Sequence, residues 1–289
     1  MSYKTAVAIG LFDGVHLGHK KVLETAVQIG IEPGFMPCAA TFTGDISPQK
    51  KIKLILSEKD RENHIKQCGI KNVFSIDFND IKNLSPVDFI EKLRDDYGAS
   101  HIVCGEDFRF GKDRAGDINT LAELCEKLGI GFTVTPELLF ENEKISSGKI
   151  RTLLENGEIE AANELLGYDF YYNLRIIRGK EIGRKLGFPT INQVIPSELV
   201  KIKNGVYLSK IEVEKKTYSG ITNFGIKPTI NYAGEPILET YIDGFDTDIY
   251  GEKVKVFVRK YLRTEIKFNN LEELKKQLEE DKLKINEWK

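Results

Sequence analysis

Cysteine is scarce in this sequence. Its 289 residues include only Cys38, Cys68, Cys104 and Cys125, which form no C-x-x-C pair and have no histidine at zinc-finger spacing. Such spacing argues against a disulfide framework and against a structural zinc site. We therefore expect free or buried thiols in a reducing cytoplasm.

Long apolar runs and an excess of one charge are also missing. No run approaches the ~20 apolar residues that span a bilayer, and the first ten residues, MSYKTAVAIG, lack the apolar core and cleavage site of a signal peptide. The net charge is −2, from 42 basic and 44 acidic residues, which gives no general attraction to nucleic acid or to anionic membranes. We expect a cytoplasmic protein with small-molecule partners, no nucleic-acid or membrane partner, and a monomeric or weakly homo-oligomeric state.

The chain length, at roughly 150 residues per domain, favours about two domains. In the first ~166 residues, strand-like runs alternate with amphipathic helical patterns, which is typical of βαβ units and a parallel sheet. The runs are TAVAIG (5–10), FMPCAATF (35–42), NVFSIDF (72–78), HIVCGEDF (101–108) and GFTVTPEL (131–138).

The pattern changes after about residue 167. Short strand-like runs separated by turn residues follow, which predicts an antiparallel sheet or small β-barrel. They are GVYLSKIEVE (205–214), KTYSGITNFG (216–225), ILETYIDGF (237–245) and EKVKVFVRKYL (252–262). Residues 269–288 read as a terminal helix that Asn269 or Asn270 caps. The predicted fold is therefore an α/β domain over 1–167 and a β-barrel domain with a terminal helix over 168–289.

The segment GLFDGVHLGHKKVL follows the first predicted strand and leads into a helix. A helix N-terminus has free N–H groups and a partial positive charge, so it suits a phosphate. His16 and His19 there can donate hydrogen bonds to phosphoryl oxygens, while Gly14 and Gly18 allow close approach of the backbone. Taken alone, the segment also allows a zinc-binding histidine pair or a plain helix start.

Two further segments of the first domain carry polar residues at element ends. GEDFRFGKDRAGD (105–117) follows a strand, where open α/β sheets bind ligands. KISSGKIR (144–151) places Ser146 and Ser147 before a helix, with Lys149 and Arg151 in its first turn. Cations are unfavourable at that end of a helix unless an anion docks there, although a simple serine cap is the alternative.

The second domain has its own glycine-containing loop, GKEIGRKLGFPTIN (179–192). Exposed N–H groups in such a loop can hold phosphate, and the neutral oxygens of Thr190 and Asn192 suit Mg²⁺. Glu239 is a carboxylate within an otherwise apolar strand, which suits a general base as well as a solvent-facing side chain. Alone, the loop could equally be a turn between strands.

Together these motifs resemble the bacterial bifunctional riboflavin kinase/FAD synthetase family over almost the whole chain. The first three segments are similar to its nucleotidyltransferase module, which transfers AMP from ATP to FMN. The resemblance implies that His16 and His19 stabilise the transition state, that Ser146, Ser147 and Arg151 hold the triphosphate, and that Asp107 lies beside the reacting centre. It also implies nucleotide contacts from the first loop, namely Gly10, Phe12, Gly14 and Gly18.

The later segments are similar to the riboflavin kinase module, through G-x-x-x-G-F-P-T-x-N, N-G-V-Y, N-x-G-x-x-P-T and L-E-T-Y. The resemblance implies that Glu239 is the catalytic base for the ribityl hydroxyl and that Thr190 and Asn192 bind Mg²⁺. The implied substrates are ATP and the flavins riboflavin and FMN, with FAD as the final product. The implied ATP-binding residues are Gly183, Arg184, Lys185, Gly187 and Phe188.

The sequence departs from the family pattern at two notable positions. Asp45 stands where the family carries a histidine, and Gly148 stands where it usually carries threonine. An aspartate beside a polyanion adds repulsion. Two alternatives therefore stay open: a monofunctional riboflavin kinase with an impaired adenylyltransferase domain, and a non-catalytic flavin- or nucleotide-binding regulator.

Overall fold

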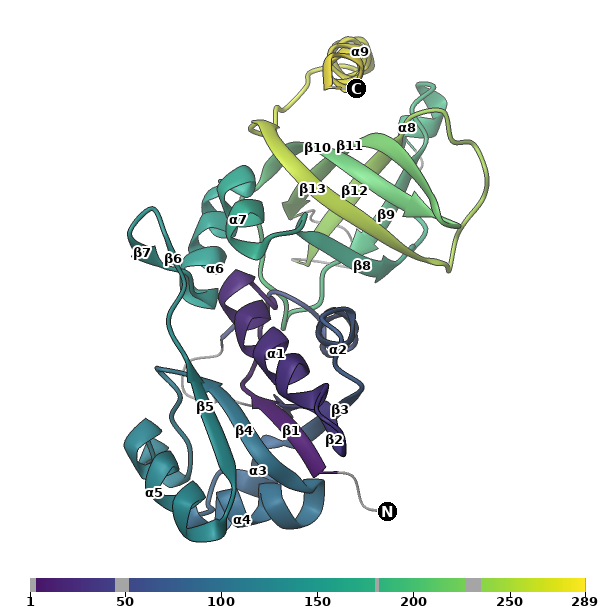
Figure 1. Cartoon of the computed structure of the whole chain (residues 1–289). Coiled ribbons are helices and arrows are strands. Elements are labelled where there is room, and N and C mark those ends of the chain that lie inside the picture. The colour runs from purple at the N-terminus through teal and green to yellow at the C-terminus, as the bar shows by residue number, and fades with distance from the viewer. Residues whose placement is uncertain (1–3, 45–51, 180–181, 227–234, 289) are drawn as a thin grey trace. The chain divides into compact units, whose positions relative to one another are not determined.

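The computed structural model describes residues 4–44, 52–179, 182–226 and 235–288. The chain forms two compact units, Met1–Ser147 and Gly148–Lys289 (Figure 1). Within the described ranges, no helix combines the length and the apolar character needed to cross a membrane.

The first unit is built on a five-stranded sheet in which every pair of neighbours is parallel. The strand order is β3-β2-β1-β4-β5, so β1 is central and is buried on both faces except at its first residue. The strands are β1 (Lys4–Ile9), β2 (Phe35–Thr43), β3 (Asn72–Asp77), β4 (Ala99–Gly105) and β5 (Gly131–Thr135). Burial on both faces explains why β1 is continuously apolar rather than alternating, whereas the edge strands β3 and β5 are only partly buried.

Helices cover both faces of this sheet. Helix α1 packs on β1, β2 and β4, and Leu23 and Ala26 are its fully buried residues. Helices α4 and α5 contribute to a hydrophobic cluster in which Phe89 and Leu121 pack with strand residues such as Val7. The helices are α1 (Leu17–Gly30), α2 (Glu58–Gln67), α3 (Phe78–Ile81), α4 (Pro86–Tyr97), η1 (Lys112–Arg114) and α5 (Ile118–Leu128).

The strand order places a topological switch point beside β1. The chain passes from β1 to β2 and β3 on one side, and then returns to β4 on the other side. Open α/β sheets bind ligands at the carboxyl ends of the two strands that flank such a point. The loops after β1 and β4 meet this requirement, and a short hairpin of β6 (Leu139–Phe140) and β7 (Glu143–Lys144) follows β5.

The second unit is a six-stranded antiparallel sheet of order β8-β13-β10-β11-β12-β9. Its edge strands approach each other, since the Gln193 side chain of β9 donates to the Leu174 carbonyl of β8 at 2.7 Å and to the Val254 carbonyl of β13 at 3.0 Å. These bonds close the sheet toward a barrel. The strands are β8 (Tyr171–Arg175), β9 (Thr190–Val194), β10 (Gly205–Val213), β11 (Lys216–Ile226), β12 (Pro236–Ile242) and β13 (Lys253–Arg263).

The terminal helix α9 (Leu271–Trp288) begins at Asn270, whose Oδ1 accepts the Glu273 N–H at 2.9 Å. This confirms one of the two predicted caps. The helix is attached to the barrel by Ile285, which is fully buried, and by Asp281, which accepts two hydrogen bonds from Arg263 at 3.0 and 2.6 Å. Lys282 of the same helix pairs with Asp243 at 3.5 Å, so apolar and ionic contacts together anchor α9.

The α/β and β-barrel architectures are confirmed, and so are the strands that were predicted. Strands β8 and β9, the hairpin β6–β7 and the short helix α8 (Ile182–Lys185) were not predicted. The domain boundary after residue 167 stays a prediction. Helices α6 (Ser147–Asn156) and α7 (Ile159–Leu166) belong to the second compact unit, where Asn163 of α7 donates to the Val258 carbonyl of β13.

Candidate functional site

The loop between β1 and α1 has an unusual backbone. Phe12, Gly14 and Val15 have φ values of 53°, 80° and 37°, and positive φ is costly for a β-branched residue such as Val15. A Cβ on Gly14 would lie 2.9 Å from Cδ1 of Ile55. Gly14 thus leaves room for Ile55 in the packing of the loop, and its predicted close approach to a ligand stays a prediction.

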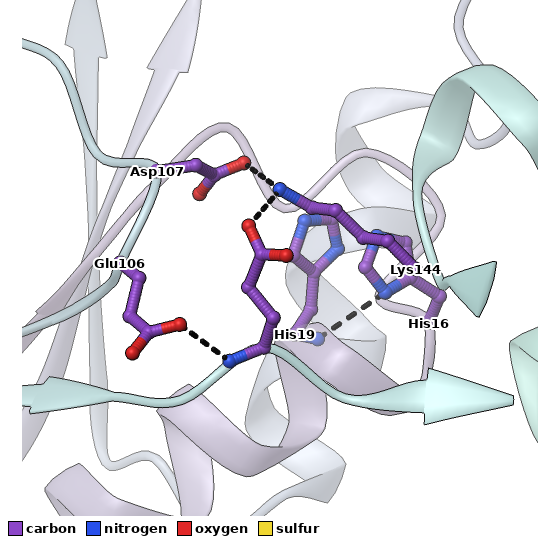
Figure 2. Close-up of polar contacts among 6 residues, drawn as sticks. His16, His19, Glu106, Asp107 and Lys144 are labelled. Carbon is purple, nitrogen blue, oxygen red and sulfur yellow. Dashed lines mark hydrogen bonds and ion pairs between the residues drawn. The ribbon is translucent and has the colours of Figure 1, made fainter. Parts of the chain in front are cut away.

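His16 and His19 form a pair at the start of α1 (Figure 2). Nδ1 of His16 accepts the His19 backbone N–H at 3.3 Å, so His16 is the N-cap of the helix. The two imidazole rings stack with their centroids 3.6 Å apart. Because Nδ1 of His16 accepts this bond, a neutral His16 carries its proton on Nε2 and can donate it there.

The pKa of His19 is held well below its usual value of 6.5 by burial of the ring, followed by the nearby His16 and Arg61. His19 is therefore neutral at pH 7 in the absence of an anion. Its Nδ1 has no hydrogen-bond partner among the residues that the structure describes. The same part of the chain contains no group of three or more His, Cys, Asp or Glu side chains that could hold a metal ion.

A cavity of about 940 Å³ lies at the switch point, and all three predicted segments line it. It is large enough for a nucleotide, since ligand pockets span roughly 300 to 1,000 Å³. Arg151 and Gly14 are not among the described residues that line it, and Arg151 belongs to the second unit. The predicted residues on its wall are Gly10, Phe12, His16, Gly18, His19, Asp107, Ser146 and Ser147.

Asp107 is held by an ion pair that was not predicted. Lys144 of β7 lies 2.8 Å from the Asp107 carboxylate and also pairs with Glu137, while the Glu137 N–H donates to Glu106 at 3.1 Å (Figure 2). Lys144 thus joins the loop after β4 to the segment after β5. Its position directly before the I-S-S motif was the available signal in the sequence.

Ser147 ties the third segment to the first. Its hydroxyl donates to the Asp13 carbonyl at 2.8 Å, so its proton is already used before any ligand binds. The contribution of Ser146 and Ser147 to triphosphate binding stays a prediction, and Asp45 lies outside the described residues.

In the second unit, the three predicted reactive residues come together. Glu239 of β12 is paired in register with Asn192 of β9, so their side chains lie on the same face of the sheet. The Thr190 hydroxyl donates to Glu239 Oε1 at 3.2 Å. Three oxygen-bearing groups in one place match the ligand preference of Mg²⁺.

The glycine-containing loop folds around α8. A Cβ on Gly183 would lie 2.4 Å from the Phe188 carbonyl oxygen, and Gly187 has φ of 85°. The Phe188 ring is buried against Tyr241 at 5.3 Å between centroids, so only its backbone could meet a phosphate. Arg184 is exposed, whereas the side chain of Lys185 lies outside the described part.

A cavity of about 390 Å³ adjoins this loop. Arg184 and Thr190 line it together with residues of the segment between β12 and β13, among them Phe245 and Tyr250. The guanidinium of Arg178 lies 4.4 Å from the centroid of the Tyr250 ring. None of the residues from this segment was predicted, because no motif of the sequence marks it.

Comparison with known families gives a separate match in each half of the chain. The family model of FAD synthetase matches residues 1–149, and that of riboflavin kinase matches residues 166–289. The chain belongs to the bifunctional riboflavin kinase/FMN adenylyltransferase family. The resemblance noted in the sequence is thereby confirmed for both halves.

Relatives match nearly the whole chain. The bifunctional riboflavin kinase/FMN adenylyltransferase of Bacillus subtilis is 37% identical, and the match covers 96% of this chain and 90% of the relative. That of Buchnera aphidicola from Schizaphis graminum is 35% identical, with 96% and 91% covered. A crystal structure from Streptococcus pneumoniae, described as a macrolide-efflux protein, is 27% identical and has a TM-score of 0.88 over 100% of this chain and 95% of that one.

Proposed function

We propose that the second unit transfers the γ-phosphate of ATP to the 5′-hydroxyl of riboflavin. The observation that carries this assignment is the juxtaposition of Thr190, Asn192 and Glu239 beside the glycine-containing loop. Glu239 takes the proton of the hydroxyl as its oxygen attacks the γ-phosphorus, and ADP leaves. Gly183, Arg184, Lys185, Gly187 and the backbone of Phe188 bind the phosphates.

Thr190 and Asn192 are the residues that would hold Mg²⁺ together with the nucleotide. Their neutral oxygens leave the ion's charge available to the phosphates of ATP, where it neutralises the charge of the transferring group. The Thr190 hydroxyl already donates to Glu239. This hydrogen bond holds the proposed base beside the proposed metal ligand.

For the first unit, we propose adenylyl transfer in the 940 Å³ cavity. A phosphate oxygen of FMN attacks the α-phosphorus of ATP, the bond to the β-phosphate oxygen breaks, and pyrophosphate leaves. No protein nucleophile is required. His16 and His19 donate hydrogen bonds to the developing charge, and Ser146, Ser147 and Arg151 hold the triphosphate.

The anionic substrates meet a cavity wall that carries several carboxylates, including Glu106, Asp107 and Glu137. Lys144 pairs with the last two and reduces their repulsion toward ATP and FMN. We further propose domains of 1–167 and 168–289, a cytoplasmic location and a monomeric or weakly associated state. The four cysteines are free, as expected for that compartment.

One experiment tests both assignments. The purified full chain is incubated with riboflavin, ATP and Mg²⁺, and the flavins are separated by chromatography over time. We expect FMN to appear first and FAD to follow, and we expect chelation of Mg²⁺ to stop FMN formation.

Two outcomes would contradict the proposal. FMN that never proceeds to FAD, even when FMN is supplied directly and the flavin is chemically reduced, would leave a monofunctional kinase. Absence of any turnover, with flavin binding retained, would identify a non-catalytic binder.

A further inference from the structure

Arg61, on α2, is a buried cation that lies outside every motif of the sequence. It is 1% exposed, and its Nη2 donates to the Phe42 carbonyl at 2.7 Å. Its Nε and Nη1 have no hydrogen-bond partner in the described ranges of the chain. A buried guanidinium with two unused donors destabilises a fold, so packing alone does not explain this residue.

Asp13, in the loop between β1 and α1, is a second buried charged residue of the first unit. It is also 1% exposed, and its Oδ1 accepts the Ile55 N–H at 2.8 Å. Burial lowers the pKa of the Arg61 guanidinium, and the charges of Asp13 and then Glu58 oppose this shift. Ile55, two residues before the Ser57 cap of α2, therefore contacts Asp13 directly, and Arg61 on α2 interacts with the same carboxylate through its charge.

Asp13 lies in the middle of the loop between β1 and α1. Its neighbours Phe12 and Val15 have positive φ, and such a backbone persists only when surrounding contacts hold it. Those contacts are made by Asp13, whose carboxylate binds the Ile55 N–H and whose carbonyl accepts the Ser147 hydroxyl. Loss of the charge that stabilises this buried carboxylate would loosen the whole loop.

We propose that Arg61 is a positioning residue of the adenylyltransferase site: its buried guanidinium stabilises the Asp13 carboxylate and so holds the strained loop that presents His16 and Gly10 to the cavity. This inference rests on the adenylyl transfer proposed above. Arg61 is not among the described residues that line the cavity, so it acts through the loop and the helix start and makes no contact with substrate.

Arg61 also acts on His19, which offers a direct readout. The groups that influence the His19 ring are His16, on the same helix, and Arg61, on α2; both add to the effect of burial in lowering its pKa. Removal of the Arg61 charge takes away one of these causes. The pKa of His19 should then rise, which a purely space-filling arginine would not produce.

The test compares Arg61→Met and Arg61→Lys in the full chain, with Arg94→Met as the matched control. Arg94 lies on α4, is exposed, and pairs with Asp95. In Arg61→Met we expect kcat for FAD formation to fall about tenfold to a hundredfold, the cost of a small misplacement of reacting groups. Riboflavin phosphorylation in the same samples should stay within about twofold, since that reaction is assigned to the other unit.

The His19 imidazole is titrated by NMR, with assignments from single His→Gln variants of the four histidines. We expect a raised pKa in Arg61→Met, and a low pKa with partial recovery of rate in Arg61→Lys, which keeps the charge. Arg94→Met should match the unmodified chain in both readouts.

A folded Arg61→Met variant with an unchanged FAD rate and an unchanged His19 titration would overturn the proposal. If Arg61→Met does not fold, Asp13→Asn decides, because the amide keeps the acceptor for Ile55 and removes the charge that Arg61 stabilises; a wild-type FAD rate there would also overturn it. An unmodified chain that makes no FAD would contradict the adenylyl transfer instead, while the His19 titration would still measure the coupling to Arg61.

Discussion

At the scale of single residues, each site contains a group whose hydrogen bonding is set before substrate arrives. His16 uses Nδ1 to cap α1, which leaves Nε2 as its donor. Glu239 accepts the Thr190 hydroxyl, which orients the carboxylate toward the proposed metal ligands. Such preorganisation reduces the reorganisation that charge development would otherwise require.

Replacement of Glu239 by Gln should lower the rate of FMN formation by a factor of roughly 10² to 10⁴, the usual contribution of a general base. Conversion of supplied FMN to FAD should be unchanged. Initial rates by flavin chromatography measure both. Glu212→Gln, an exposed carboxylate paired with Lys255 on the same barrel, is the control, and equal rates in both variants would remove Glu239 from its assigned role.

The lowered pKa of His19 predicts a pH-dependent stability. The unfolded chain binds a proton near pH 6.5 that the folded chain does not bind, so the free energy of unfolding of the first unit decreases as the pH falls below about 6.5. The loss is at most about 1.4 kcal/mol for each pH unit. His19→Asn should reduce this slope, and His64→Asn, on α2, should leave it in place.

Hydrogen exchange of the β1 amides (Lys4–Ile9), corrected for intrinsic exchange rates, measures this slope between pH 7.5 and about 5.5. An identical slope in His19→Asn and in the unmodified chain would contradict the neutral assignment of His19.

At the scale of elements, two connections decide how the sites are held. The loop between β1 and α1 contains Gly14, which has a positive φ and leaves space for the side chain of Ile55. Helix α9 relies on the Arg263–Asp281 pair, whose side chains are 21% and 6% exposed.

Gly14→Ala should destabilise the first unit by more than Gly129→Ala. Both glycines have positive φ, of 80° and 65°. Alanine at either position should therefore lower the free energy of unfolding by about 1 to 2 kcal/mol because of its backbone conformation. Only Gly14 also has a neighbour, Ile55, at 2.9 Å from the added Cβ. Thermal unfolding and FAD formation measure the difference, and equal effects of the two variants would show that the contact with Ile55 relaxes freely.

Asp281→Ala should destabilise the barrel by about 3 kcal/mol, because it leaves Arg263 largely buried without its partner. The kinase rate should fall as α9 loosens, since Ile285 and Leu278 of this helix pack in the cluster that contains Phe188 of the phosphate loop. Glu279→Ala, in an exposed pair at 4.0 Å on the same helix, should change stability by no more than about 1 kcal/mol. Similar melting curves for the two variants would contradict the anchoring role.

At the scale of the whole molecule, the two reactions share an intermediate, FMN, but His19 and Glu239, assigned one to each reaction, belong to separate units. A mixture of His19→Ala and Glu239→Gln chains should therefore convert riboflavin to FAD, because FMN made by the first variant can be adenylylated by the second. FAD should appear after a lag that shortens with protein concentration. A mixture that accumulates FMN without FAD, although each variant keeps its remaining activity, would show that FMN does not pass between molecules.

Much of this architecture follows from local patterns. Continuous apolar runs alternating with amphipathic helices predict a parallel sheet, and Asn270 before Leu271 predicts a helix start, because these signals depend on neighbours a few residues apart. The segments around His16, Asp107 and Ser147 could be placed at one sheet edge by the same logic, since parallel strands end together. The family motifs add the chemistry, and the family comparisons agree.

The remaining features depend on contacts between residues far apart in the chain. Lys144 meets Asp107 across 37 positions, and Ser147 meets Asp13 across 134. The sequence alone allows the Phe188 side chain to face a ligand, whereas in the structure the ring is buried against Tyr241. In the sequence, Arg61 is one more charge on a polar helix. Only the tertiary structure, in which it is buried and donates to the Phe42 carbonyl of β2, makes it a buried cation. Local propensity decides which elements form, whereas burial and electrostatics between elements decide which side chains act, because desolvation and charge pairing exist only after the chain has folded.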